Sequence, residues 1–226
     1  MDKQIRNAFI IGGVLAVVGL VLYLKKAKGG QTLNKKSLDP KVEDPELHKN
    51  FKLDLIPDGK GNYRSAQLTA TQLPYVIKKY GIKRIIRMNG DGRDSQHRSS
   101  YPETPRSVEE GICRANGCEF KYVYSASGYK KGQGFTKSID EISRILDQGN
   151  TLIHCAHGAD RTGGMVGAYL KNRRYMTDKD QLWEYTTKYN GWKNMIKRGT
   201  FFGSGYDKYA DGFYPIDELK AKYSKK

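Results

Sequence analysis

A cysteine and an arginine are separated by five intervening residues within residues 153–163, whose sequence is IHCAHGADRTG. Cys155 begins this arc, Arg161 ends it, and Thr162 follows directly. A phosphate ester under attack needs a nucleophile in line with its leaving group and a ring of donors around its other oxygens. A short loop that closes onto a helix N-terminus supplies such a ring, because its backbone N–H groups converge and the helix dipole adds positive potential. The spacing therefore indicates thiolate attack on phosphorus.

The side chains of this loop suit separate steps of that chemistry. The positive potential favours Cys155 as a thiolate, and Arg161 can hold two phosphate oxygens with its planar guanidinium. Thr162 can donate its hydroxyl to the sulfur when the sulfur leaves. The phosphate is predicted to bind to the loop residues Ala156, His157, Gly158, Ala159, Asp160 and Arg161.

A strand and a helix have to hold this loop. The apolar run at 151–154 predicts a buried strand that enters it, and residues 162–173 predict a helix that leaves it. Small residues early in that helix are expected to allow close packing on the strand: Gly163, Gly164, Gly167 and Ala168.

The remaining pattern alternates between strands and helices. Helices are predicted over 71–80, 107–116, 137–146 and 178–189 and around 192–202, and strands over 83–88 and 120–124. Such alternation predicts an α/β fold with a mostly parallel central sheet flanked by helices. The loop then lies at the carboxyl end of a strand, where such sheets bind ligands.

The loop resembles the signature of the cysteine-dependent protein tyrosine and dual-specificity phosphatase superfamily, which is His-Cys, five residues, Arg and then Ser or Thr. Residues 62–69, NYRSAQLT, are similar to the Tyr-Arg-Ser-x-Gln segment of small atypical dual-specificity-like phosphatases. The two matches span roughly residues 51–190. The resemblance implies a dual-specificity-phosphatase-like fold and a phosphocysteine intermediate on Cys155. An unrelated structural cysteine is the alternative.

The resemblance also implies a general acid on a mobile loop after the preceding strand. The corresponding segment, 125–134, contains no carboxylate. Asp160 occupies a position similar to the loop aspartate of myotubularin-like enzymes, where it is a proposed acid, so it is the preferred catalytic candidate. Asp91 and Asp94 are alternatives from an earlier loop. Asp160 could instead only pair with an arginine or cap the loop.

Two histidines flank Cys155. His154 is expected to order the loop, and no second ligand cluster accompanies it, so neither a metal nor another cofactor is predicted. His157 makes the loop similar to that of RNA 5′-triphosphatases of the same superfamily, and this activity is the alternative function. A catalytically weak phosphate-binding module is the other alternative.

An uncharged run extends from Asn7 to Leu24, and a membrane-spanning helix needs about 17–25 apolar residues. Residues 1–28 are therefore predicted to form a single-pass transmembrane anchor, 29–50 a flexible linker and 51–226 the phosphatase domain. A cleaved signal peptide or a buried core helix fits less well. Lysines after the run favour a cytoplasmic catalytic domain. A disulfide between Cys113 and Cys118 stays open for an extracytoplasmic one.

The chain carries a formal net charge of +16. Such a surface attracts polyanions and anionic membranes. Phosphotyrosine protein is the leading predicted substrate, with phosphoinositide next. Nucleic acid is a less favoured partner, because the sequence contains no recognised RNA-binding module.

Overall fold

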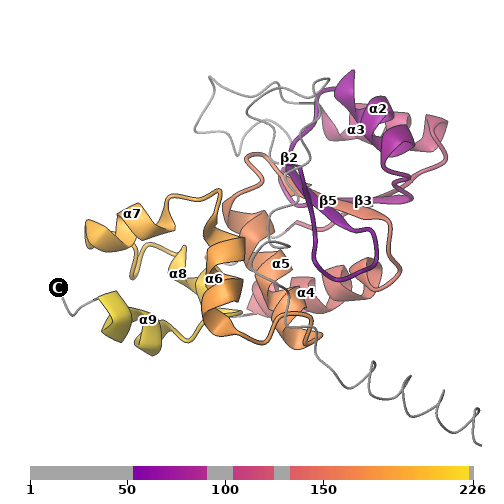
Figure 1. Ribbon diagram of the computed structural model, residues 1–226. Helices are drawn as coiled ribbons and strands as arrows, with labels where there is room; N and C mark the ends of the chain where they lie inside the picture. Colours follow the sequence, from indigo (N-terminus) through magenta and orange to yellow (C-terminus); the bar gives the residue numbers. More distant parts are fainter. Residues whose placement is uncertain (1–52, 91–103, 125–132, 224–226) are drawn as a thin grey trace, which may run out of the picture. The chain divides into compact units, whose positions relative to one another are not determined.

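The computed structural model describes residues 53–90, 104–124 and 133–223 (Figure 1). Its strands are β1 (Asp54–Leu55), β2 (Tyr63–Ala66), β3 (Arg84–Arg87), β4 (Glu119–Tyr122) and β5 (Thr151–Cys155). Its helices are α2 (Gln72–Lys79), α3 (Arg106–Ala115), α4 (Gln133–Leu146), α5 (Asp160–Asn172), α6 (Lys179–Thr187), α7 (Trp192–Lys197), α8 (Asp207–Asp211) and α9 (Ile216–Tyr223).

The five strands form one sheet in the order β1-β2-β5-β3-β4. β5 is central and parallel to both neighbours, β2 and β3, and β4 is parallel to β3. β1 is antiparallel to β2. The prediction of a mostly parallel sheet is confirmed, and the one antiparallel strand lies at its edge. The parallel arrangement brings the carboxyl ends of β2, β3 and β5 to the same edge of the sheet.

Helices cover both faces of this sheet, with α2 and α3 on one face and α4 and α5 on the other (Figure 1). The first layer encloses a buried apolar cluster to which α2 contributes Leu73, Val76 and Ile77, while Ile85 and Leu152 come from the strands. Because side chains alternate along a strand, the next residue of each strand, Ile86 and Ile153, faces the opposite layer. Both are fully buried, so each face of the sheet carries a core.

The helix that leaves the catalytic loop packs closely against later helices. A Cβ atom at Gly163 would lie 2.7 Å from the carbonyl oxygen of Thr186 in α6, and one at Gly164 would lie 2.8 Å from Tyr209 in α8. At Gly167 the near neighbours are Thr186 and Phe213. The prediction that these glycines allow packing on the strand is wrong. They accommodate the C-terminal helices instead.

The predicted anchor (1–28) and linker (29–50) lie outside the described residues. Within the described ranges, no helix combines the length and apolarity needed to span a bilayer. Cys113 and Cys118 are both buried free thiols, so the open alternative of a disulfide is not realised in this structure.

Candidate active site

Cys155 is the last residue of β5, and its side chain is 5 % exposed. β5 is fully buried and hydrogen-bonded on both edges, so the position of the sulfur is fixed by the central strand of the sheet. Four residues follow before α5 begins at Asp160. Cys155 therefore stands beneath a short loop at the head of a 13-residue helix, as the sequence predicted.

Two carbonyl groups of this loop accept hydrogen bonds from β2 and from Gln67, which directly follows it. The Ala156 carbonyl accepts a hydrogen bond from the Gln67 amide at 3.2 Å, and the Gly158 carbonyl accepts one from Arg64 NH2 at 3.0 Å. In a planar trans peptide the following N–H points the opposite way. The amides of His157 and Ala159 consequently point away from Gln67 and Arg64, and we infer that they face the inside of the loop. This arrangement of converging N–H groups suits a phosphate.

Gly158 permits the loop to lie against β2. Its φ is +62°, and a Cβ atom there would be 2.5 Å from the carbonyl carbon and oxygen of Ser65 and from the amide nitrogen of Ala66. These neighbours are backbone atoms of a central strand and cannot move aside cheaply. Glycine is therefore required both by the left-handed conformation and by the close approach.

The first turn of α5 carries the other predicted residues. Thr162 is buried, and its hydroxyl donates a hydrogen bond of 3.1 Å to Cys155 Sγ. Arg161 and Asp160 are partly exposed at the N-terminus of the helix, as is His157 in the loop. The structure thus brings Cys155, Thr162 and the loop together as predicted, with the positive end of the α5 dipole directed at the loop.

Arg64 lies in the segment 62–69 and is a further functional candidate, to which the sequence pattern assigned no role. It is fully buried in β2, donates to the carbonyls of Gly158 and Tyr185, and lies over the rings of Tyr185 and Tyr189 at 5.6 and 5.4 Å. Among the described residues, no carboxylate lies within ion-pair distance of it. Its guanidinium therefore adds positive charge directly behind the phosphate loop.

On the other side of β5, His154 is held by a buried polar cluster. Its Nε2 lies 2.7 Å from Glu109 Oε1, and the second carboxylate oxygen accepts a 2.8 Å hydrogen bond from Arg87. Burial opposes ionisation of Glu109, but His154 and Arg87 outweigh it and hold the pKa of this carboxyl below its usual range. Arg87 also donates to the carbonyls of Asn89, Gly90 and Thr104. These contacts hold His154 beside the nucleophile, and its role in ordering the loop stays a prediction.

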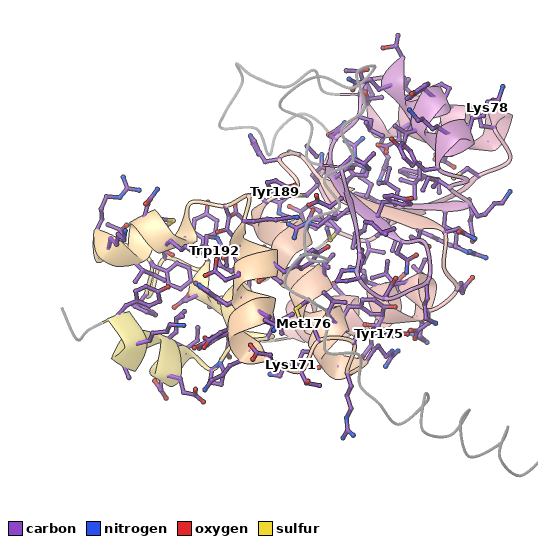
Figure 2. The ribbon with its side chains drawn as sticks, in the orientation of Figure 1. Lys78, Lys171, Tyr175, Met176, Tyr189 and Trp192 are labelled. Atoms are coloured by element: carbon purple, nitrogen blue, oxygen red, sulfur yellow. The ribbon has the colours of Figure 1, made fainter. Side chains whose placement is uncertain are left out.

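Asp160 has a partner that the sequence did not suggest. The indole N–H of Trp192, the first residue of α7, donates a 2.8 Å hydrogen bond to Asp160 Oδ1. Figure 2 labels Trp192 and also Tyr189, which lies in the connection before α7. The carboxylate is thereby held by a buried side chain from the C-terminal helices. Asp91, Asp94 and segment 125–132 lie outside the described residues.

The described residues contain no group of three or more His, Cys, Asp and Glu side chains that could hold a metal ion. The functional candidates are instead a thiol, a hydroxyl, a carboxylate and arginines. These groups suit phosphoryl transfer through a covalent intermediate.

No protein-family model matches the chain, and no curated protein matches it. Solved structures are similar to it, and three of them are described here by their identity and coverage. TpbA of P. aeruginosa has 17 % identity and a TM-score of 0.46, with 80 % of this chain and 93 % of that chain covered. The catalytic domain of the PP-IP phosphatase SIW14 of S. cerevisiae has 17 % identity and a TM-score of 0.47, with 78 % and 92 % covered. A putative phosphatase of Shewanella putrefaciens has 16 % identity and a TM-score of 0.48, with 76 % and 90 % covered.

Two of these similar structures are named as phosphatases.

Proposed function

We propose that this chain is a membrane-anchored phosphatase that hydrolyses phosphate monoesters through a phosphocysteine. The observation that carries the proposal is the 3.1 Å hydrogen bond from Thr162 to Cys155 Sγ. It places a donor on the sulfur at the point where a strand, a phosphate-sized loop and a helix N-terminus meet. A merely structural thiol has no need of this arrangement.

In the first step the phosphoryl group lies in the loop, held by the inward-facing amides and by Arg161. Cys155 Sγ attacks phosphorus and forms the S–P bond while the bond from phosphorus to the leaving oxygen breaks. Asp160 gives its proton to that oxygen, so a neutral alcohol or phenol departs.

In the second step a water molecule attacks the phosphocysteine. Asp160, now ionised, takes a proton from the water, the S–P bond breaks, and inorganic phosphate leaves the loop. Thr162 stabilises the departing thiolate through its hydroxyl. Asp160 thus serves first as acid and then as base, and no metal or cofactor enters either step.

We infer a phosphotyrosine protein as the leading substrate and a phosphoinositide as the next. The similar solved structures include TpbA in complex with pTyr and the PP-IP phosphatase SIW14, an inositol pyrophosphate phosphatase. The formal charge of +16 supports an acidic substrate. The uncharged run 7–24 supports an anchor that places the domain beside a membrane, with the lysines after it favouring the cytoplasmic side.

The experiment is hydrolysis of p-nitrophenyl phosphate by the full chain, by Cys155→Ser and by Cys118→Ser. Cys118 is a second buried free cysteine outside the loop, which makes it a matched control. We expect Cys155→Ser to lose activity by a factor on the order of 10³ or more, while Cys118→Ser retains it. Equal activity of the two variants would remove the thiolate mechanism.

A second set of substrates separates the candidate functions. We compare a phosphotyrosine peptide, a phosphoinositide in vesicles and 5′-triphosphorylated RNA. Release of phosphate from RNA alone would replace the proposal with the triphosphatase, which His157 and the loop aspartate leave open. Phosphate binding by the full chain with no turnover on any substrate would replace it with a binding module.

A further inference from the structure

The hydrogen bond between Trp192 and Asp160 joins residues 32 positions apart in the chain. Through this contact α7 reaches a proposed catalytic side chain. Trp192 is 1 % exposed, whereas Asp160 lies partly exposed at the head of α5. A buried donor therefore holds one oxygen of the carboxylate at the head of α5.

An aromatic cluster fixes the position of the donor. The Trp192 ring stacks on Phe213 with ring centroids 6.3 Å apart and contacts Phe201 at 5.6 Å. Phe213 packs in turn on the backbone of α5 at Gly167, where a Cβ atom would be only 2.8 Å from its ring. The indole is thus braced against the same helix that carries Asp160, two turns further along.

A second tryptophan of the same aromatic cluster forms no such hydrogen bond among the described residues. Trp183 of α6 is also 1 % exposed and lies 6.1 Å from Trp192, ring to ring. Its indole N–H is buried without a hydrogen-bond partner in the described part of the chain. Packing alone consequently explains Trp183 but not the alignment of the Trp192 N–H with a carboxylate oxygen.

We propose that Trp192 is a positioning residue that holds the Asp160 carboxyl in the orientation needed for proton transfer to the leaving group. The inference rests on the proposed function. With Oδ1 accepting from the indole, the acidic proton resides on Oδ2, because a protonated oxygen is a poor acceptor. The indole thereby selects which oxygen meets the substrate and restricts rotation of the side chain.

The dependence on the leaving group distinguishes this role from a structural one. Phenoxide leaves with more difficulty than p-nitrophenoxide, so hydrolysis of phenyl phosphate requires the proton more. Loss of acid positioning should therefore reduce kcat/KM on phenyl phosphate preferentially, because kcat/KM reports formation of the phosphocysteine, whereas its hydrolysis is common to both substrates. A general loosening of the fold would lower the hydrolysis of both substrates by the same factor.

The experiment compares Trp192→Phe, Trp183→Phe, Asp160→Asn and the double variant Trp192→Phe/Asp160→Asn in the full chain. Both tryptophan changes remove the same ring volume from one cluster, but only Trp192→Phe removes a hydrogen bond to Asp160. A further variant carries 3-benzothienylalanine at position 192, an isosteric analogue of tryptophan without the N–H. It keeps the packing if phenylalanine does not fold.

We expect Trp192→Phe and the benzothienyl analogue to lower kcat/KM on phenyl phosphate about 10-fold more than on p-nitrophenyl phosphate. Trp183→Phe should leave the ratio of the two substrates as in the parent. In the Asp160→Asn background the second change should add less than about 2-fold, because its target is already gone.

Equal losses of activity on the two substrates would overturn the proposal. So would a double variant in which the activity losses of the two single variants multiply in full. Parent-like turnover of phenyl phosphate by Asp160→Asn would overturn it as well, by removing Asp160 as the acid. That outcome is distinguishable from failure of the phosphatase function, because Cys155→Ser would still abolish hydrolysis.

Discussion

The two strands that flank β5 each bury an arginine beside the catalytic loop, and the two arginines have different partners. Arg87 in β3 forms an ion pair with Glu109, which also contacts His154. Arg64 in β2 is equally buried but contacts carbonyl oxygens and tyrosine rings, with no ion pair to a carboxylate among the described residues.

A buried charge is expensive unless it is compensated. The Arg87 charge is compensated within the protein, so its contribution is structural: it ties α3 to the residue before the nucleophile. The Arg64 charge has no carboxylate within ion-pair distance in the described part of the chain, and it lies behind the loop that is proposed to bind phosphate. We infer that one arginine stabilises the fold and the other stabilises the bound anion.

The largest expected effect comes from removing the carboxylate that compensates the charge of Arg87. Glu109→Gln removes the carboxylate that both Arg87 and His154 contact. Loss of one partner of a buried ion pair typically costs about 3–5 kcal/mol, so we expect a loss of about 3 kcal/mol in the free energy of unfolding at neutral pH. Urea denaturation of both proteins measures it.

The effect should depend on pH in a defined direction. Because the pKa of Glu109 is lowered in the folded protein, its contribution is present above the unfolded value of about 4.3 and is lost as pH falls through the folded value. The gap between parent and variant should therefore narrow below about pH 4. Glu110→Gln is the control, since its partner Arg114 is exposed and such pairs contribute under ~1 kcal/mol. Comparable losses in the two variants would contradict the assignment.

The next largest effect tests the contact between the catalytic loop and β2, the strand that carries Arg64. Gly158→Ala places a Cβ atom 2.5 Å from the backbone of β2, so the loop has to shift. A displacement of about 1 Å can cost about 100-fold in catalysis, and we expect this loss in kcat/KM on p-nitrophenyl phosphate. Gly81→Ala is a matched control, with φ of +64° and no atom within 4 Å of the added Cβ. It should lose about 1 kcal/mol of stability and no activity. An equal loss of activity at Gly81 would show that conformational strain alone is responsible.

The sequence predicted those parts of the molecule that depend on neighbours along the chain. The loop, β5 and α5 follow from apolar runs and from the spacing of Cys155 and Arg161, and the helices α2 to α7 were predicted to within a few residues, whereas α8 and α9 were not predicted. β2 was not predicted as a strand, because its centre is the charged residue Arg64 rather than an alternating apolar pattern. α8, with five residues, is too short to show a helical period.

Contacts between distant parts of the chain were not predictable in the same way. Glu109 and His154 are 45 positions apart, and Trp192 and Asp160 are 32 apart. Only the tertiary fold brings them together, so a pattern in one sequence carries no sign of either pair. The glycines of α5 were correctly expected to allow close packing, but the partner surface was assigned wrongly for the same reason.

The smallest expected effect isolates the uncompensated charge. Arg64→Met removes it, and Arg64→Lys retains a charge but not the planar guanidinium that reaches both carbonyls. In the Cys155→Ser background we expect Arg64→Met to weaken binding of tungstate, a phosphate analogue, about 10-fold, near the low end of the ~1.5–3 kcal/mol that a hydrogen bond from a charged donor contributes. Arg64→Lys should lie between parent and Arg64→Met. Calorimetric titration of the full chain measures both.

Arg84→Met provides the control for this experiment. Arg84 also donates to a loop carbonyl, that of Gly149, but it lies at the amino end of β3, at the opposite edge of the sheet from the phosphate loop. Its loss should leave tungstate affinity unchanged. If Arg64→Met binds tungstate as the parent does while its stability falls by several kcal/mol, Arg64 is a structural arginine like Arg87. A weaker anion affinity with little change in stability instead establishes that the buried positive charge on the β2 side is balanced by the substrate itself.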